Sequence, residues 1–124
     1  MNLDQRLVSV VEAARSKKAF RIRLLDVKGI ASFTDTFAFM SGGSDRQNRA
    51  ISQAIEDALR LTGERPISRE GETNGNWVLL DYGNLVVHIM DEDTRRHYNL
   101  EGLWNAGREL ELHPETHPES DLRP

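Results

Sequence analysis

The sequence predicts a mixed α/β fold, with a β-sheet of about five strands and helices packed on it. Residues 3–16 and 44–60 repeat apolar side chains every three or four positions, which is typical of amphipathic helices. Residues 20–27 alternate apolar and charged side chains, and residues 77–90 form an apolar run around a glycine, as strands do. The elements follow in the order helix, strand, strand, helix, strands, helix, which favours helices packed against one sheet.

Two predicted strands follow the first helix. The first strand is expected to have one wet face with arginines and one covered face with Phe20, Ile22 and Leu24. Gly29 ends this strand. Residues 36–41 predict a second, short strand that is closed by two glycines.

Residues 44–60 carry the clearest helix signal. Ser44 can cap the backbone N–H of Gln47, whose side chain can reach back in a capping box. Gly63 suits the position just after a helix, where the backbone often adopts a left-handed conformation. The stripe expected to be buried consists of Ala50, Ile51, Ala54, Ile55, Ala58 and Leu59.

In the second half of the chain, residues 66–68 predict a weak strand. We expect it at an edge of the sheet, because its proline cannot donate to a strand ladder. Residues 77–90 predict a β-hairpin that turns at Gly83 and one of its two neighbours. Residues 91–98 predict a short helix. Three apolar residues are expected to pack the end of the domain: Leu100, Leu103 and Trp104.

Charge divides the chain into a neutral domain and an acidic tail. The 16 lysines and arginines stand against 20 aspartates and glutamates, a net charge of −4. Five of these acids and one base lie from residue 109 onward, so 15 acids and 15 bases precede it. We therefore expect one domain over residues 1–108 and a flexible, proline-containing tail over residues 109–124. A neutral domain lacks the basic surface that nucleic-acid binding requires, so no direct DNA binding is expected.

The sequence also predicts a cytoplasmic protein without membrane contact. It has no cysteine, hence no disulfide and no thiolate zinc site. Acidic residues interrupt the apolar positions near the N-terminus, unlike in a secretory signal. No apolar run approaches the roughly 20 residues that cross a bilayer.

The predicted hairpin is apolar on both faces, which is unusual for antiparallel strands with one wet side. Because either two-residue turn pairs residues of opposite parity, one partition of the side chains follows. The first face holds Val78, Leu80, Tyr82, Leu85, Val87 and Ile89. The second face holds Trp77, Leu79, Asp81, Val86, His88 and Met90. Asp81 and His88 become diagonal neighbours on that second face.

Two arrangements explain the second face. In one, the helices at residues 3–16 and 44–60 cover it. In the other, part of it stays exposed as a docking surface with Trp77 and Tyr82 as anchors, since Trp and Tyr are enriched among binding hot spots. The residue pattern leaves both open.

No motif supports an active site or a metal site. The run GGSDRQ before the helix lacks the lysine of a phosphate loop, and no following strand supplies the two metal-binding carboxylates of a nucleotidyltransferase. Asp81 and His88 have neither a cysteine nor a GxSxG serine to activate. His113 and His117 have a ligand-like spacing, but prolines and the tail favour coincidence. We expect no catalytic residue, no metal and no cofactor.

Four segments resemble, in order and spacing, the ribosomal silencing factor family, also called Iojap-related proteins. They read KKAFRIRLLDVKGIASFTDTF, SGGSDRQNRAI, NWVLLDYGNLVVHIM and RRHYNLEGLW. The resemblance extends from about Leu3 to Trp104. Thr36 stands where the family usually has tyrosine, and Asn84 replaces the usual aspartate, which we expect to weaken an ionic contact with the partner.

This resemblance implies a nucleotidyltransferase-like topology without catalytic carboxylates, and a translational repressor that is not an enzyme. Family members bind the large ribosomal subunit through its fourteenth protein, at the face that meets the small subunit. They block subunit joining when nutrients are short. The resemblance places the partner-binding surface at Trp77, Leu79, Leu80, Asp81, Tyr82, His88 and Met90.

Three alternatives stay open. A vestigial nucleotidyltransferase-like protein would bind nucleotide at GGSDRQ. A homodimer would pair through the apolar hairpin face and hide the ribosome-binding surface. An RNA-binding module would use a strip of four arginines, namely Arg21, Arg23, Arg46 and Arg49.

Overall fold

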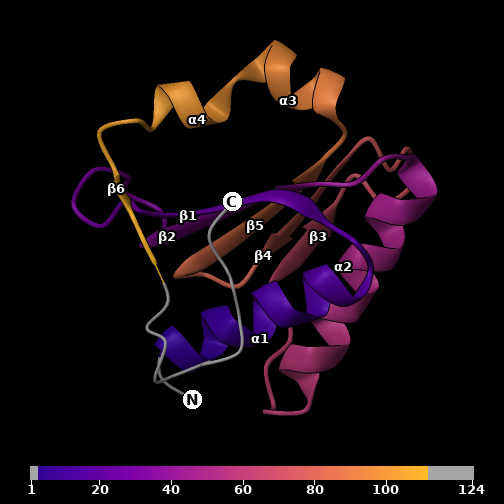
Figure 1. Cartoon of the computed structure of the whole chain (residues 1–124). Helices are drawn as coiled ribbons and strands as arrows, with labels where there is room; N and C mark the ends of the chain where they lie inside the picture. The colour runs from indigo at the N-terminus through magenta and orange to yellow at the C-terminus, as the bar shows by residue number, and fades with distance from the viewer. Residues whose placement is uncertain (1–2, 112–124) are drawn as a thin grey trace.

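The computed structural model describes residues 3–111. Their elements, in chain order, are α1 (Leu3–Ser16), β1 (Phe20–Asp26), β2 (Thr36–Ser41), α2 (Asp45–Arg60), β3 (Ser68–Glu70), β4 (Trp77–Asp81), β5 (Leu85–Met90), α3 (Glu92–Tyr98), α4 (Leu100–Leu103) and β6 (Arg108–Glu109). The strands form one sheet in the order β3-β4-β5-β2-β1-β6, in which β2 and β5 are parallel and all other neighbours antiparallel. Helices α1 and α2 lie on one face of the sheet, and α3 and α4 lie on the other (Figure 1). The predicted α/β class is confirmed, with one strand more than predicted.

Capping hydrogen bonds place α2 and join it to the end of α1. The Ser44 hydroxyl accepts a hydrogen bond from the Gln47 backbone N–H at 3.0 Å, as predicted. The Gln47 side-chain oxygen reaches one residue further back than expected and accepts from the Gly43 N–H at 2.7 Å. Its amide nitrogen donates to the carbonyls of Lys17 and Lys18 at 3.0 and 3.2 Å. This one side chain therefore fixes the end of α1 against the start of α2.

Strand β1 contains a bulge that alternation alone did not predict. The pairing with β2 shifts register between Phe20 and Arg23, and Arg21 has a positive φ of 52°. Ile22 and Leu24 face the core as expected. Phe20 is exposed, because the extra residue turns it away from the core face.

Both edges of the sheet differ from the prediction. Strand β3 covers Ser68–Glu70 rather than residues 66–68, although it does form an edge. The other edge is β6, in which Glu109 pairs with Leu25 across the boundary predicted between domain and tail. Residues 112–124, which include the histidine pair of the tail, lie outside the described residues.

The two predicted hairpin faces are confirmed. Strands β4 and β5 join through a two-residue turn at Gly83-Asn84, flanked by a hydrogen bond from the Tyr82 N–H to the Leu85 carbonyl at 2.8 Å. Gly83 has a φ of 89°, which glycine adopts without strain. The first face belongs to the core under α1 and α2, together with Leu7, Val10, Val11, Ile51, Ile55 and Leu59.

The second face forms a separate core, and of the two arrangements left open by the sequence, the one in which the two long helices cover it is wrong. Both long helices lie on the first face, because the crossover from β2 to β5 carries α2 there. Val27 and Ala31 of the loop after β1, Leu100 of α4 and Trp104 cover part of the second face instead. Leu103, also expected to pack, is exposed.

Candidate partner-binding site

Strand β4 presents three partly exposed side chains to the second face of the sheet. Trp77, Leu79 and Asp81 are half-buried, whereas Val78 and Leu80 between them are fully buried on the other face. This alternation follows from the two-residue period of a strand. We call Trp77, Leu79 and Asp81 the β4 strip.

His88 lies beneath Trp77 and orients it. The indole N–H of Trp77 donates to Nδ1 of His88 at 3.1 Å. The imidazole is only 4% exposed and stacks on Phe39, with ring centroids 5.1 Å apart and planes 18° from parallel. Burial lowers the pKa of His88 to about 4, so the ring is neutral at physiological pH. Because Nδ1 accepts, the proton resides on Nε2, which has no hydrogen-bond partner among residues 3–111.

Asp81 and His88 lie diagonally across β4 and β5, as predicted, since Asp81 pairs with Val86 and Leu79 with His88. Asp81 does not bind His88 within the described residues. Its Oδ1 accepts a hydrogen bond from the Gly83 N–H at 2.8 Å. The carboxylate therefore braces the hairpin turn and leaves Oδ2 for another donor.

Tyr98 of α3 packs against the other side of Trp77. Their ring centroids are 4.9 Å apart, and the Tyr98 side chain is 55% exposed. Asp91 caps the N-terminus of helix α3, where its side chain accepts from the Thr94 N–H at 2.7 Å. Trp77 is thus held between two rings while part of its surface faces solvent.

Aromatic contacts continue across the second face to Phe33, in the loop between β1 and β2. Phe33 is 60% exposed and lies 5.9 Å from Phe37 and 6.0 Å from Trp104, measured between ring centroids. Phe37 in turn lies 5.4 Å from His88. The residue pattern did not predict Phe33 or Tyr98 as part of this surface, because a loop and the end of a short helix have no period that indicates which side chains face a sheet.

Ion pairs hold α3 and α4 against β1 and β2. Arg95 of α3 is 3% exposed, donates to the Ser41 hydroxyl at 2.9 Å and binds the Glu101 carboxylate at 2.5 and 3.1 Å. Arg23 of β1 binds the same carboxylate at 3.0 Å and Glu109 at 2.6 Å. Burial raises the pKa of Glu101, but hydrogen bonds from Arg95 and Arg23 outweigh burial and leave this pKa below its usual value.

The remaining expected contact residues lie elsewhere or deeper. Leu80 is fully buried, and Tyr82 is 7% exposed; both belong to the core under α1 and α2. Burial raises the pKa of the Tyr82 phenol to about 12. His88 and Met90 do share a face with the β4 strip but are buried beneath it. The structure therefore brings five of the seven residues to one face and leaves Leu80 and Tyr82 on the opposite face.

Asn84 is exposed in the hairpin turn, and its side chain contacts α1. Its side-chain oxygen accepts a hydrogen bond from Arg6, whose guanidinium also pairs with Glu64 at 2.9 Å. Asn84 thus ties the hairpin turn to α1.

The sites considered for other functions are engaged in structural contacts. Backbone N–H groups of the GGSDRQ run are bound by the side chains of Ser44 and Gln47. Ion pairs join Arg21 to Glu92, Arg23 to Glu101 and Glu109, and Arg49 to Asp45. Over residues 3–111 no group of three or more His, Asp or Glu side chains is placed to hold a metal ion. Within the same residues, no helix combines the length and apolar character of a membrane span.

Comparisons with known proteins agree with this fold. A sequence profile of the family described as "Ribosomal silencing factor during starvation" matches residues 1–123. The ribosomal silencing factor RsfS of Bacillus subtilis is 38% identical over 104 residues, which are 84% of this chain and 88% of that protein. The mouse protein named "Mitochondrial assembly of ribosomal large subunit protein 1" is 30% identical over 98 residues, 77% of this chain and 43% of that protein.

A solved structure shows the same architecture. The crystal structure of protein CV0518 from Chromobacterium violaceum superposes with a TM-score of 0.81 at 29% identity, over 90% of this chain and 92% of that one. The match of nearly the whole sequence, together with this architecture, shows that the chain belongs to the ribosomal silencing factor family.

Proposed function

We propose that the chain represses translation in the cytoplasm by binding the large ribosomal subunit through the subunit's fourteenth protein. It would occupy the face that meets the small subunit and block subunit joining, chiefly under nutrient limitation. Membership of the family supports a silencing role at the ribosome, and the name of the mouse relative supports the large subunit. The half-buried β4 strip, with the exposed ring of Tyr98 against Trp77 and that of Phe33 further across the same face, is the observation that carries the proposal.

The strip suits a protein partner because its main anchor is held in advance. Trp77 is fixed between His88 and Tyr98, so docking costs little side-chain entropy. Leu79 adds apolar area beside it, and the free Oδ2 of Asp81 can accept from a basic group of the partner. Apolar contact would give the affinity, and the carboxylate would give orientation.

Repression by this route needs no chemical step. A body of 14.1 kDa on the joining face excludes the other subunit for as long as it stays bound. The degree of block then follows mass action, in which about 1.4 kcal/mol of binding free energy changes the affinity ten-fold. The protein therefore acts as a steric inhibitor and is not an enzyme.

Co-sedimentation with isolated large subunits tests this proposal. Loss of a buried aromatic anchor costs about 2 to 4 kcal/mol, so Trp77→Ala should weaken binding about 30- to 1,000-fold. Asp81→Asn is the second variant, because asparagine keeps the oxygen that binds Gly83 but replaces the charged Oδ2 acceptor with an NH2 donor. It should fold normally and still bind more weakly.

The matched control is Leu61→Ala. Leu61 is 89% exposed at the end of α2, on the opposite face of the molecule, so its loss should leave binding unchanged. If Trp77→Ala and Asp81→Asn keep the wild-type circular dichroism spectrum and sediment with the subunits as the wild type does, the β4 strip is not the binding site.

We propose further that two copies of the chain can pair through the same face. The exposed rings of Tyr98, against Trp77, and of Phe33, further across the same face, support this pairing, which would hide the strip from the ribosome. Light scattering over a range of protein concentrations should then show a dimer that Trp77→Ala weakens. A mass that stays monomeric at every concentration would exclude it.

A further inference from the structure

The positive charges of the domain fall into two classes. Nine arginines form an ion pair with a carboxylate: Arg6, Arg21, Arg23, Arg49, Arg60, Arg69, Arg95, Arg96 and Arg108. The other lysines and arginines of residues 3–111 form no ion pair within that range: Arg15, Lys17, Lys18, Lys28, Arg46 and Arg65. Although the positive and negative charges of the domain balance, these unpaired cations are therefore available to bind an external anion.

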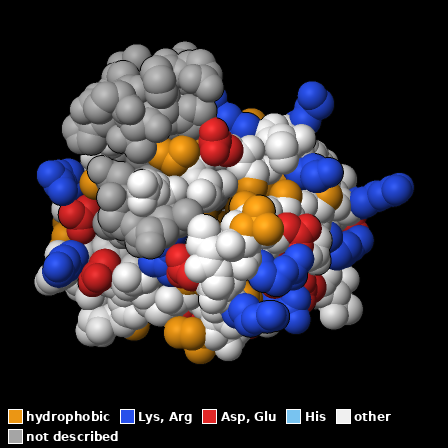
Figure 2. Space-filling model, turned by 90° about the horizontal axis from the view of Figure 1, so that it is seen from below, with side chains coloured by type: hydrophobic (Ala, Val, Ile, Leu, Met, Phe, Trp, Pro, Cys, Tyr) orange, Lys and Arg blue, Asp and Glu red, His pale blue; other side chains and the backbone are white. Residues whose placement is uncertain are grey.

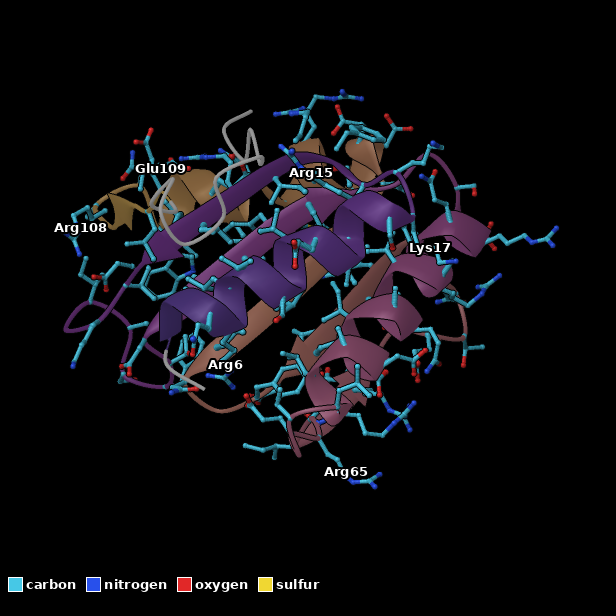
Figure 3. All side chains as sticks on the ribbon, turned by 60° about the horizontal axis from the view of Figure 1, so that its bottom comes forward. Arg6, Arg15, Lys17, Arg65, Arg108 and Glu109 are labelled. Atoms are coloured by element: carbon cyan, nitrogen blue, oxygen red, sulfur yellow. The ribbon has the colours of Figure 1, made fainter. Side chains whose placement is uncertain are left out.

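Four of these unpaired cations lie where α1 ends and α2 begins. Arg15 is in the last turn of α1, Lys17 and Lys18 follow it directly, and Arg46 is in the first turn of α2. All four are exposed, and the two helix ends are held together by the Gln47 side chain. Arg15 and Lys17 are seen at this end of α1 in Figure 3. We call Arg15, Lys17, Lys18 and Arg46 the basic corner.

Two acids of α2 pair with arginines outside the basic corner. Asp45, next to Arg46, binds Arg49 at 3.0 Å, and Asp57 binds Arg60 at 2.6 Å. The face formed by α1 and α2 shows lysine and arginine side chains gathered on the side of α2, with apolar side chains in small separate patches (Figure 2). This composition suits a polyanion better than an apolar protein surface.

The basic corner lies at the same end of the sheet as Trp77. Strand pairing forms one continuous row, Phe20 with Ser41, Ser41 with Met90, and Met90 with Trp77. Phe20 comes two residues after the corner's Lys18. One large partner can therefore contact the β4 strip on one face and reach the basic corner around the end of the strands.

We propose that the basic corner binds the phosphate backbone of RNA in the large subunit while the β4 strip contacts protein. This inference rests on the proposed function, because it takes the large subunit as the partner. Exposed ammonium and guanidinium groups lose little hydration when they approach phosphates, and their binding releases the counterions condensed on RNA. Of the four arginines that the sequence suggested for an RNA-binding strip, only Arg46 belongs to this surface.

Salt dependence of binding to isolated large subunits tests the inference. Each lost phosphate contact lowers the slope of log affinity against log salt by about 0.7 to 0.9. The triple variant Lys17→Gln, Lys18→Gln, Arg46→Gln should therefore reduce the slope by about 2 to 3. It should weaken binding on the order of 100-fold at about 0.1 M salt.

Two arginines on α2 and the loop after it provide a matched pair. Arg46→Gln should reduce the slope by about 0.7 to 0.9, which corresponds to one phosphate contact. Arg65→Gln removes the same charge from another unpaired, exposed arginine beyond the far end of α2 and should leave slope and affinity unchanged. Equal effects of Arg46→Gln and Arg65→Gln would overturn the basic corner as a specific site.

A second arm uses the fourteenth large-subunit protein alone, without RNA. The triple variant should bind it as tightly as the wild type, whereas Trp77→Ala should lose affinity. If the triple variant loses equal affinity for the isolated protein, the corner binds protein and the inference is wrong. If it keeps the wild-type slope on whole subunits, the inference fails while the proposed function stands. A wild-type protein that binds no large subunits at any salt concentration would overturn the proposed function, and this inference with it.

Discussion

Trp77 reaches the surface in one orientation because an uncharged histidine lies beneath it. The indole N–H needs an acceptor, and Nδ1 of His88 supplies one only while that nitrogen has no proton. Phe37 and Phe39 surround the imidazole and offer no counter-charge. A single buried side chain thus links the pH of the solution to the geometry of the proposed anchor.

The stability of the fold should fall as pH falls from about 6.5 to about 4. In the unfolded chain His88 takes up a proton near pH 6.5, whereas in the folded chain burial lowers its pKa to about 4. The unfolded state therefore binds more protons in this window, and acid favours it. Since one pKa unit corresponds to 1.36 kcal/mol, the loss between pH 7 and pH 4.5 is roughly 2 to 3 kcal/mol.

Urea unfolding of the wild type and of His88→Gln checks this prediction. Glutamine does not titrate, so the variant should lose less stability over the same range, and the difference isolates His88 from the carboxylates. Identical pH dependence of the two proteins would show that His88 does not carry the effect.

At the scale of elements, α3 and α4 are fastened to the sheet by charge as well as by packing. Arg95 bridges from α3 to Glu101 of α4 and to Ser41 of β2. A buried charge is costly when its partner is missing. Removal of one member of this pair would therefore destabilise the fold, because the other charge would stay buried without compensation. Tyr98, which contacts Trp77, lies on the same helix as Arg95.

Arg95→Met should destabilise the protein by about 3 kcal/mol and loosen Tyr98 from Trp77. Denaturant unfolding measures the first effect, and the emission of Trp77 in a Trp104→Phe background measures the second. The neighbouring Arg96→Met is the control, because its pair with Asp93 is almost fully exposed and should contribute less than about 1 kcal/mol. Equal losses in the two variants would refute a fastening role for Arg95.

Periodicity predicted the elements well where many residues repeat a pattern, as in α1, α2 and the hairpin. Periodicity failed where an element consists of only a few residues or depends on pairing with another strand. Strand β6 has two residues, and the bulge of β1 arises from its pairing with β2. The cover of the second face depends on contacts such as that of Arg23 with Glu101, which are 78 residues apart in sequence. No local pattern contains such a contact.

The candidate site was predicted only in part, again because some of its contacts join residues that no local pattern connects. Strand parity alone separated Trp77 and Leu79 from Leu80 and Tyr82. The enrichment of Trp and Tyr among binding hot spots nevertheless paired Tyr82 with Trp77, and the family resemblance added Leu80, although both residues lie on the other face. Tyr98 was missed because its contact with Trp77 depends on how α3 packs.

On the scale of the whole molecule, the sheet separates two surfaces of different chemistry. One face has half-buried aromatic and apolar side chains, and the other carries α1, α2 and the basic corner. Most arginines are used in ion pairs, so the neutral sum of charges says little about where cations remain free. In the proposed complex, a ribosomal subunit, which offers both protein and RNA, would contact both surfaces together.

Light scattering of mixed ribosomal subunits tests most directly whether the bound protein prevents joining. At saturating wild-type protein, scattering should stay at the level of separate subunits, and Leu61→Ala should behave identically. Trp77→Ala, added at the same concentration, should restore the rise that accompanies joining. Joining that proceeds normally in the presence of saturating wild-type protein would contradict obstruction as the mechanism.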